Sequence, residues 1–299
     1  MNTNLTGKTG ILGIIGWPVA HSLSPLMQNA ACVALGLDYV YVPFPVAPEN
    51  LRKAVDGLRA LGVTGFNVTI PHKEAIVGLL DILSDEARLI GAVNTVKREG
   101  DRLTGHNTDA AGLITSLQDD LEFDIKGSRV LLLGAGGAAR AAIVGLCRAG
   151  AASVIVANRT PDKAERLVAD FRSAFSGANL AVSPLDILKG DQRLKDVDLL
   201  INTTAVGLGG TTFDGVDLAP MAPCACVYDM VYSPALTPLL AEARRNSLRS
   251  ANGVGMLAAQ GEAAFSFWTG CEPPNGLMKS RLMAALGGQD MLDNEVYSK

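Results

Sequence analysis

The sequence has few of the residues that build metal centres and disulfide frameworks. It holds five cysteines, an odd number, and no two of them form a C-x-x-C pair. The three histidines, His21, His72 and His106, are never three or four residues apart. Zinc sites and disulfide scaffolds need such pairs. We therefore expect no metal, and a reducing compartment in which most of the cysteines are small buried hydrophobes.

Long apolar runs and an excess of positive charge are also missing. No stretch reaches the roughly 18 charge-free apolar residues of a membrane span, and the N-terminal sequence has no signal-peptide pattern. The net charge of -4 gives no overall positive field that would attract nucleic acid or anionic lipid. We expect a cytoplasmic protein, a monomer or a homodimer, whose partner is a small molecule.

What is present is an alternation of β-branched runs with amphipathic segments, which is typical of βαβ units and a mostly parallel sheet. In the first third, strands are expected at ILGII, YVYVPF, VTGFNVTI and GAVNTV, with helices between them that include residues 71–83. A second series begins at Ser128 with RVLLLG and a helix over residues 137–149. The fold class is therefore α/β, with two sheets.

A chain of 299 residues is long enough for two domains. The acidic, polar run over residues 116–128 carries turn signals and marks the expected boundary. The last 45 residues are mainly helical in pattern and follow the final strand of the second series. We expect them to pack back onto the first domain, so the predicted domains are 1–110 with 253–299, and 111–252.

The segment LLLGAGGAARAAIVGL fits the dinucleotide-binding pattern G-x-G-x-x-G/A. Its glycines lie between a predicted buried strand and a predicted helix, so backbone N–H groups at the helix start can face a pyrophosphate. The alternative is a glycine-rich turn that serves only close packing of the strand and the helix. No P-loop pattern occurs in the sequence.

The next strand ends in ANRT and not in a carboxylate. NAD enzymes place an Asp or Glu about 20 residues after the glycine loop, where it bonds the ribose 2′-hydroxyl. Here Asn158, Arg159 and Thr160 occupy that place, and Lys163 follows one turn later. An arginine can pair with a 2′-phosphate, so the sequence predicts NADP; the alternative is a solvated surface arginine.

Four stretches of the first domain are dense in polar side chains. They cover residues 16–30, 65–74, 91–96 and 105–112. Each lies at the C-terminal end of a predicted strand or on the helix that follows, which is where open α/β sheets bind ligands. Their hydroxyls, amides, lysine and aspartate suit a polyhydroxylated substrate.

These stretches, with LLLGAGGAARAA, ANRT, INTTAVG, DMVYSP and NGVGMLAAQG, resemble the signatures of the shikimate dehydrogenase family. They occur in the family's order over about residues 10–270. The resemblance implies a substrate domain and a Rossmann-type NADP domain with a cleft between them. It also implies reversible NADPH-dependent reduction of 3-dehydroshikimate to shikimate, in chorismate and aromatic amino-acid biosynthesis.

The resemblance further implies roles for individual residues. Lys73 and Asp109 are the catalytic pair. The substrate carboxylate is bound by Ser22 and Ser24 with Tyr232 near them, and the ring hydroxyls by Asn67, Thr69, Asn94 and Gln260. The cofactor side comprises Asp85, Gly134, Ala135, Gly136, Gly137, Ala138, Asn158, Arg159, Thr160, Lys163, Thr203, Met230 and Gly253.

Lys73 suits this role physically, because reduction of a ketone needs a proton donor beside the reacting oxygen. Pro71 fits the first position of the helix expected over 71–83, which places Lys73 in its first turn. A cation there is disfavoured by the helix dipole and gives up its proton more readily. Asp109, at the start of another helix, stays ionised and pulls the other way, so which member of the pair moves the proton stays open. Only one of His72 and Lys73 can face the site, and we choose Lys73.

One departure from the family motif concerns the substrate. After HSxSP the motif often continues to His-Asn, whereas this sequence reads Met27, Gln28, Asn29. A quinate/shikimate dehydrogenase of dual specificity is therefore an alternative. A second alternative, an inactive NADP-binding regulatory module, is disfavoured by the presence of both Lys73 and Asp109.

Overall fold

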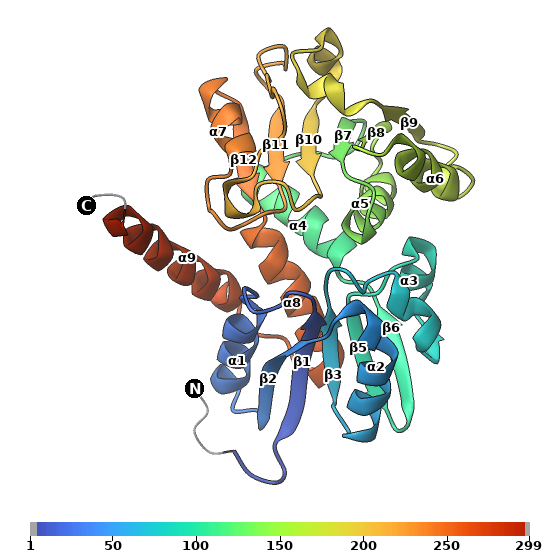
Figure 1. Ribbon diagram of the computed structural model, residues 1–299, viewed down its shortest axis with the longest axis vertical. Helices are drawn as coiled ribbons and strands as arrows, with labels where there is room; N and C mark the ends of the chain where they lie inside the picture. The colour runs from blue at the N-terminus through green and yellow to red at the C-terminus, as the bar shows by residue number, and fades with distance from the viewer. Residues whose placement is uncertain (1–4, 297–299) are drawn as a thin grey trace. The chain divides into compact units, whose positions relative to one another are not determined.

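The structure of the protein is a computed structural model that describes residues 5–296, with side chains up to residue 287. The chain divides into two compact units, each with its own sheet (Figure 1). Unit 1 comprises Met1–Gly112 and Leu257–Ala285, and unit 2 comprises Leu113–Met256 and Leu286–Lys299. Both units are α/β, as the alternation of strands and helices predicts.

Unit 1 contains a mixed sheet in the order β2-β1-β3-β5-β6-β4. Strand β1 is parallel to β2 and β3, and β4 is parallel to β6, whereas β5 is antiparallel to both of its neighbours. The strands are β1 (Gly10–Gly16), β2 (Tyr39–Pro45), β3 (Gly65–Val68), β4 (Ile82–Leu83), β5 (Thr95–Glu99) and β6 (Arg102–His106).

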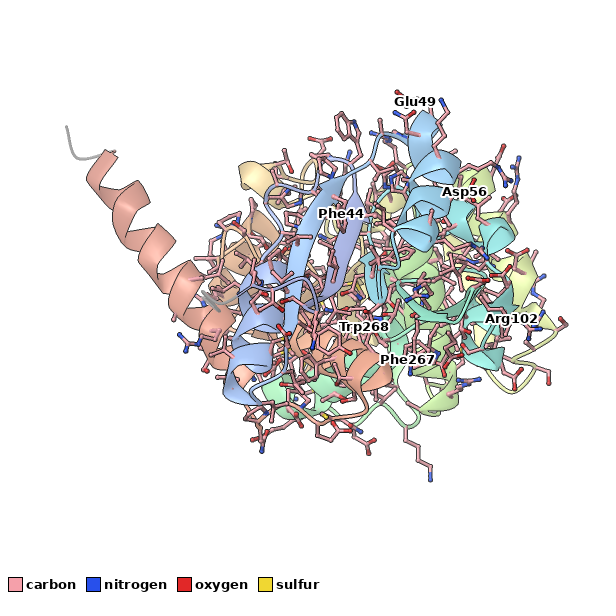
Figure 2. All side chains as sticks on the ribbon, turned by 90° about the horizontal axis from the view of Figure 1, so that it is seen from below. Phe44, Glu49, Asp56, Arg102, Phe267 and Trp268 are labelled. Atoms are coloured by element: carbon pink, nitrogen blue, oxygen red, sulfur yellow. The ribbon has the colours of Figure 1, made fainter. Side chains whose placement is uncertain are left out.

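Helices cover this sheet with apolar side chains, and two separate clusters form its core. One joins Ile15, Phe66 and Val96 of the strands to Val55 and Leu58 of α2. The other joins the strands to α8, where the Trp268 indole N–H donates to the Val96 carbonyl at 2.9 Å (Figure 2). The helices of unit 1 are α1 (Ser24–Ala34), α2 (Leu51–Ala60), α3 (Asp85–Ile90) and most of α8 (Val254–Thr269), with the short 3-10 helices η1 (Pro48–Asn50) and η2 (Ala75–Leu79). Helix α4 (Asp109–Leu121) begins in unit 1 and belongs mostly to unit 2, and α9 (Leu277–Val296) has residues in both.

Unit 2 contains a fully parallel sheet in the order β12-β11-β10-β7-β8-β9. The strand order reverses between β7 and β10, which is the doubly wound arrangement. Runs such as LLIN in β10 are buried along their whole length, as expected of parallel strands that are covered on both faces. The strands are β7 (Arg129–Leu133), β8 (Ser153–Ala157), β9 (Asn179–Ser183), β10 (Leu199–Asn202), β11 (Cys226–Asp229) and β12 (Arg249–Asn252).

The helices of unit 2 follow the strands in the alternation that the sequence predicts. Helix α5 (Gly137–Arg148) follows β7, α6 (Pro161–Arg172) follows β8, and α7 (Pro238–Arg245) follows β11 (Figure 1). The 3-10 turns are η3 (Leu185–Leu188), η4 (Gln192–Asp196) and η5 (Leu208–Gly210). The first helix therefore begins directly after the glycine loop, where a dinucleotide site needs it.

The helix expected over residues 71–83 is wrong. Residues 71–74 form a turn, and η2 (Ala75–Leu79) is the helical part that follows. Distant segments take the backbone groups that an α-helix would use, since the Lys73 carbonyl accepts from Val93 N at 2.8 Å and the Ile70 carbonyl from Trp17 N at 3.0 Å. A tertiary hydrogen bond therefore takes the Lys73 carbonyl, while the His72 carbonyl still accepts locally from Ile76 N at 3.0 Å.

The bounds of two other predicted segments differ from the structure. The strand expected over GAVNTV begins only at Thr95, because residues 91–94 form an irregular loop whose Val93 and Asn94 N–H groups bond to Lys73 O and His106 O. The polar run over residues 116–128 is not a linker throughout. Its first half continues α4 to Leu121, where Leu113, Leu117 and Leu121 form the buried face of that helix.

Candidate active site

A lysine and an aspartate meet in the interior of unit 1. Lys73 Nζ donates to Asp109 Oδ2 at 2.6 Å, and the two side chains are only 18% and 5% exposed. Asp109 is the first residue of α4, and a carboxylate is favoured at that end of a helix. Its own N–H donates to Asn107 Oδ1 at 3.0 Å, which fixes the turn into the helix.

Lys73 lies in the turn after β3 and not in a helix, so the predicted effect of a helix dipole on it is wrong. The turn is held from several sides: His72 N donates to Thr69 O at 2.9 Å, and the Lys73 carbonyl is bound by Val93. The neighbouring His72 is buried, with Nε2 donating to Val46 O at 2.7 Å. His72 therefore braces the turn, and Lys73 is the residue that reaches Asp109.

Asn94 connects the pair to the rest of unit 1. Its Nδ2 lies 2.9 Å from Asp109 Oδ1, 2.9 Å from Thr108 Oγ1 and 3.4 Å from Gln260 Oε1. Its Oδ1 accepts from Thr108 N at 2.8 Å and from Thr95 Oγ1 at 3.0 Å. Since an amide has two N–H donors, the contact of 3.4 Å with Gln260 is the weakest of the three. Asn94 thus orients the carboxylate of Asp109.

Asn67 lies beside this network on β3. Its Nδ2 donates to Asn94 O at 3.0 Å and to Thr95 Oγ1 at 3.1 Å, and its Oδ1 accepts from the Tyr41 hydroxyl at 2.7 Å. Tyr41, Thr95 and Thr108 were not predicted as site residues. Tyr41 reads as an ordinary strand residue, whereas Thr95 and Thr108 lie in the polar stretches 91–96 and 105–112. The Thr108 hydroxyl donates to Gln260 O at 3.0 Å.

The other predicted substrate residues of unit 1 lie after β1 and β3, at the start of α1 and on α8. Ser24 begins α1, is buried, and its N–H donates to Ser22 Oγ at 3.3 Å. Thr69 directly follows β3, and a side chain at Gly16, the end of β1, would collide with its Cγ2 methyl. Gln260 on α8 donates through Nε2 to Leu257 O at 2.7 Å. Tyr232 belongs to unit 2.

The glycine loop of unit 2 follows β7 directly. Gly134 has φ +110°, and a Cβ there would lie 2.6 Å from Thr203 Oγ1, so the loop after β10 touches the loop after β7. A Cβ at Gly136, the residue before α5, would meet nothing within 4 Å. The first turn of α5 carries no acidic residue. An open helix N-terminus at the reversal of strand order suits a dinucleotide pyrophosphate, with Gly134 to Ala138 around it.

Cations follow β8. Asn158 Nδ2 donates to Thr160 O at 2.9 Å and so shapes the turn between β8 and α6. Arg159 and Lys163 are exposed at this turn. No carboxylate stands among residues 158–161, and the exposed Asp162 follows in the first turn of α6. The guanidinium of Arg159 suits a phosphate.

A buried carboxylate fixes the loops after β10 and β11. Asp229 accepts from Asn202 Nδ2 at 2.8 Å, from Thr237 Oγ1 at 2.6 Å and from Val231 N at 3.0 Å. Burial raises its pKa from the ordinary value, and the three hydrogen bonds oppose that rise. Met230 follows it directly, and a side chain at Gly253 would collide with the Met230 carbonyl. Sequence reasoning missed Asp229 because it reads as part of an apolar strand.

One predicted cofactor residue lies apart from these. Asp85 is exposed at the first position of α3 in unit 1, after Ser84, whose hydroxyl accepts from Ala87 N at 3.1 Å. Its position is explained by the helix N-terminus, where an acidic side chain is favoured. The predicted contact of Asp85 with the cofactor stays a prediction.

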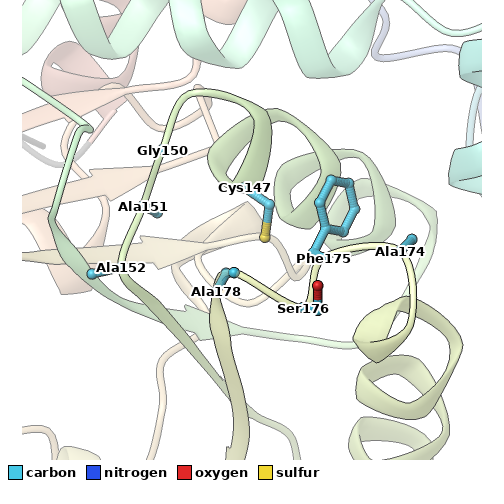
Figure 3. A pocket seen from close by; sticks show the side chains of 9 residues that line it. Cys147, Gly150, Ala151, Ala152, Ala174, Phe175, Ser176 and Ala178 are labelled. Carbon is cyan, nitrogen blue, oxygen red and sulfur yellow. The ribbon is translucent and has the colours of Figure 1, made fainter.

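A hollow on unit 2 differs from both sites. It is lined by Cys147 of α5 together with residues 150–152 and 174–178, which precede β8 and β9 (Figure 3). It therefore lies at the amino ends of the strands, opposite the glycine loop, and it presents no charged side chain. Burial raises the pKa of the Cys147 thiol to about 11.

Within residues 5–287, whose side chains the structure describes, no cluster of three His, Cys, Asp or Glu side chains has the geometry of a metal site. No helix in that same part of the chain is both long enough and apolar enough to cross a membrane.

The two units together indicate a dinucleotide-dependent dehydrogenase. One is a doubly wound nucleotide-binding unit, and the other is an α/β unit with a buried lysine–aspartate pair. Family models match within both units: "Shikimate dehydrogenase substrate binding domain" at residues 14–96, "Shikimate / quinate 5-dehydrogenase" at 116–208 and "Shikimate 5'-dehydrogenase C-terminal domain" at 253–283. The chain belongs to the shikimate dehydrogenase family.

Individual relatives agree with the family models. The chain is 61% identical over 283 residues to a shikimate dehydrogenase (NADP(+)) of Geobacter metallireducens, covering 95% of this chain and 99% of that protein. It resembles the crystal structure of shikimate dehydrogenase from Aquifex aeolicus at a TM-score of 0.85 and 38% identity, covering 93% and 99% of the two chains. The Thermus thermophilus enzyme in complex with NADP(H) and shikimate gives a TM-score of 0.82 and 37% identity, covering 93% and 100%.

Proposed function

We propose that this chain is an NADP-dependent shikimate dehydrogenase, an oxidoreductase that interconverts 3-dehydroshikimate and shikimate. The observation that carries the proposal is the buried contact of 2.6 Å between Lys73 Nζ and Asp109 Oδ2. It lies in a chain whose relatives bear that activity in their names. An inactive nucleotide-binding module would have no need to bury such a pair, since burial of charges is costly.

The residues of unit 2 fit the cofactor. When bound, NADPH supplies the hydride that reduces the substrate carbonyl carbon. The backbone from Gly134 to Ala138 would hold the pyrophosphate, and Arg159 with Lys163 would pair with the 2′-phosphate of the adenosine ribose. Thr203, Met230 and Gly253 would line the nicotinamide end, held in place by Asp229 and its donors.

The residues of unit 1 fit a ring that carries a carboxylate and several hydroxyls. We assign Ser22 and Ser24 to the carboxylate, with Tyr232 near them, because two hydroxyls at the start of α1 can donate to an anion. Asn67, Thr69, Asn94 and Gln260 offer amide and hydroxyl groups for the ring hydroxyls. The network between them predicts that they act as one preorganised surface.

Proton transfer falls to Lys73 and Asp109. In the direction of reduction the pair delivers a proton to the oxygen of the reacting carbonyl, and in the reverse direction it removes the proton from the hydroxyl. Asn94 keeps the second carboxylate oxygen of Asp109 occupied at 2.9 Å. Oδ2 therefore faces Lys73, and the two side chains form a coupled unit that exchanges one proton with the substrate.

The direct test is a spectrophotometric panel with purified protein. We expect NADP reduction with shikimate, NADPH oxidation with 3-dehydroshikimate, and a much lower kcat/KM when NAD replaces NADP. Tight binding of NADPH without any turnover of shikimate would leave the inactive nucleotide-binding module as the better account.

One residue favours a second candidate, dual action on quinate. Gln28 stands where the family motif often has histidine, is completely buried on α1, and donates to Gly261 O at 2.9 Å, next to Gln260. Its position so close to a predicted substrate residue predicts an effect on substrate choice. The ratio of kcat/KM for shikimate to that for quinate, in the wild type and in Gln28→His, decides between the two candidates.

Two expectations remain outside these proposals. A monomeric or homodimeric state is a prediction that light scattering coupled to size-exclusion chromatography would check. A cytoplasmic location is likewise a prediction from composition, and fractionation of cells that produce the protein would check it.

A further inference from the structure

Tyr41 is buried beneath the predicted substrate surface, and its hydroxyl holds a predicted substrate residue. The hydroxyl donates to Asn67 Oδ1 at 2.7 Å. The residue is 1% exposed, and its ring packs against Trp268 at a centroid distance of 6.0 Å. Its backbone N–H and C=O are both bound by the Asn29 side chain at 2.9 Å. The hydroxyl is therefore held in place.

The hydrogen bonds of Asn67 leave one lone pair of its side-chain oxygen unused. An amide side chain has two N–H donors and an oxygen with two lone pairs. Both donors are used, by Asn94 O and Thr95 Oγ1, and one lone pair is used by Tyr41. Rotation of the amide by 180° would set Oδ1 against the Asn94 carbonyl and the amino group against the Tyr41 donor. The surroundings thus present Asn67 as an acceptor through its second lone pair.

We propose that Tyr41 is a positioning residue that locks the Asn67 amide, so that its oxygen accepts a hydrogen bond from a ring hydroxyl of the substrate. The inference rests on the proposed function, because it needs a substrate that carries a ring hydroxyl. It adds a buried residue, remote from solvent, to those that determine specificity.

The test is Tyr41→Phe, which removes the hydroxyl and leaves the ring. We expect KM for shikimate to rise about tenfold, the effect of losing one well-oriented neutral hydrogen bond. The values of kcat and of KM for NADP should change less than about twofold, because Lys73, Asp109 and unit 2 keep their contacts. The matched control is Tyr228→Phe, which removes another buried tyrosine hydroxyl, bound to Ser116 at 2.7 Å. Its KM for shikimate should stay unchanged.

A double-mutant cycle separates positioning from general loss of packing. In an Asn67→Ala background, Tyr41→Phe should change KM for shikimate by less than about twofold, because the group through which it acts is gone. An equal tenfold rise in both backgrounds, or no rise in the wild-type background, would overturn the inference.

A second variant covers the case in which Tyr41→Phe does not fold. Thr95→Val removes the acceptor on the other side of the Asn67 amide, and a rise of KM for shikimate is expected there too; an unchanged KM contradicts the lock. Failure of the proposed function is distinguishable, since the wild type would then show no turnover of shikimate at all. An active wild type with unaffected Tyr41→Phe and Thr95→Val enzymes refutes only the role of Tyr41.

Discussion

The two predicted binding regions are built on opposite principles. In unit 1, the Lys73–Asp109 pair belongs to a connected set of side chains: Asn94 bonds Asp109, and Gln260 of α8, Asn67 of β3 and Tyr41 of β2 are linked to it by hydrogen bonds. In unit 2, the glycine loop offers backbone and open space, and the cations of the turn after β8 are exposed. A reaction at one carbon atom requires side chains held in fixed positions. A long, phosphate-bearing cofactor instead requires glycines that let it approach the backbone, and charged side chains that it can reach.

The largest effect on activity is expected from removal of the Lys73 ammonium group. Lys73→Ala removes the proposed proton carrier and leaves Asp109 without its ion-pair partner, so kcat should fall by about 10² or more, within the range for acid–base groups. Shikimate binding should change much less. Steady-state kinetics beside calorimetric titration of shikimate would measure both, with Lys97→Ala, a partly exposed lysine of β5, as the control. Turnover close to that of the wild type would remove Lys73 from the mechanism.

Removal of an exposed cationic side chain in unit 2 should have a smaller effect, and one that is confined to NADP. Arg159→Ala should raise KM for NADP by about 10-fold to 100-fold, the worth of one hydrogen bond to a charged group, and leave KM for NAD nearly unchanged. The loss should shrink at high salt, because the site is exposed. Arg172→Ala, at the other end of α6, removes the same charge as a control. Equal losses with NADP and NAD would contradict the assignment to the 2′-phosphate.

The open space of the glycine loop can be filled directly. Gly134→Ala places a methyl group 2.6 Å from Thr203 Oγ1 at a φ of +110°, so we expect a destabilisation of about 1–3 kcal/mol, the cost of such backbone strain. We also expect KM for NADP to rise about tenfold, since the loop must shift. Gly177→Ala, where a Cβ meets nothing within 4 Å, is the control. Urea denaturation and cofactor kinetics would measure the pair, and equal behaviour of the two variants would speak against a close approach.

The smallest effect is a pH dependence of stability that belongs to unit 1, because every histidine of the chain lies there. Burial lowers the pKa of His106 from its ordinary 6.5, and nearby Glu86 opposes this. Below pH 6.5 the unfolded chain then binds more protons than the folded one. The free energy of unfolding should therefore fall as the pH drops from 6.5 towards the lowered pKa. Urea denaturation at several pH values should show a weaker fall in His106→Asn; parallel curves would refute this role.

The two regions also differ in how well their residues can be predicted from sequence. In unit 2 the glycine loop and the NRT turn are contiguous motifs whose strand and helix neighbours form where the hydrophobic pattern predicts them. In unit 1 the turn that holds Lys73 was predicted as a helix, because its backbone partners, Val93 and Trp17, lie far away in the sequence. Tyr41 escaped notice because its hydroxyl is bonded across 26 residues to Asn67, a separation that no local pattern reports.

Asn94 carries a consequence for attempts to change what the protein accepts. Its backbone carbonyl accepts a hydrogen bond from Asn67 Nδ2, and its side-chain Nδ2 donates to Asp109 Oδ1. The proposed recognition of the ring and the proposed proton transfer thus depend on the same residue, Asn94. Substitutions of Asn67 that change substrate choice are therefore expected to change the rate of the chemical step as well, and to need compensating changes around Asp109.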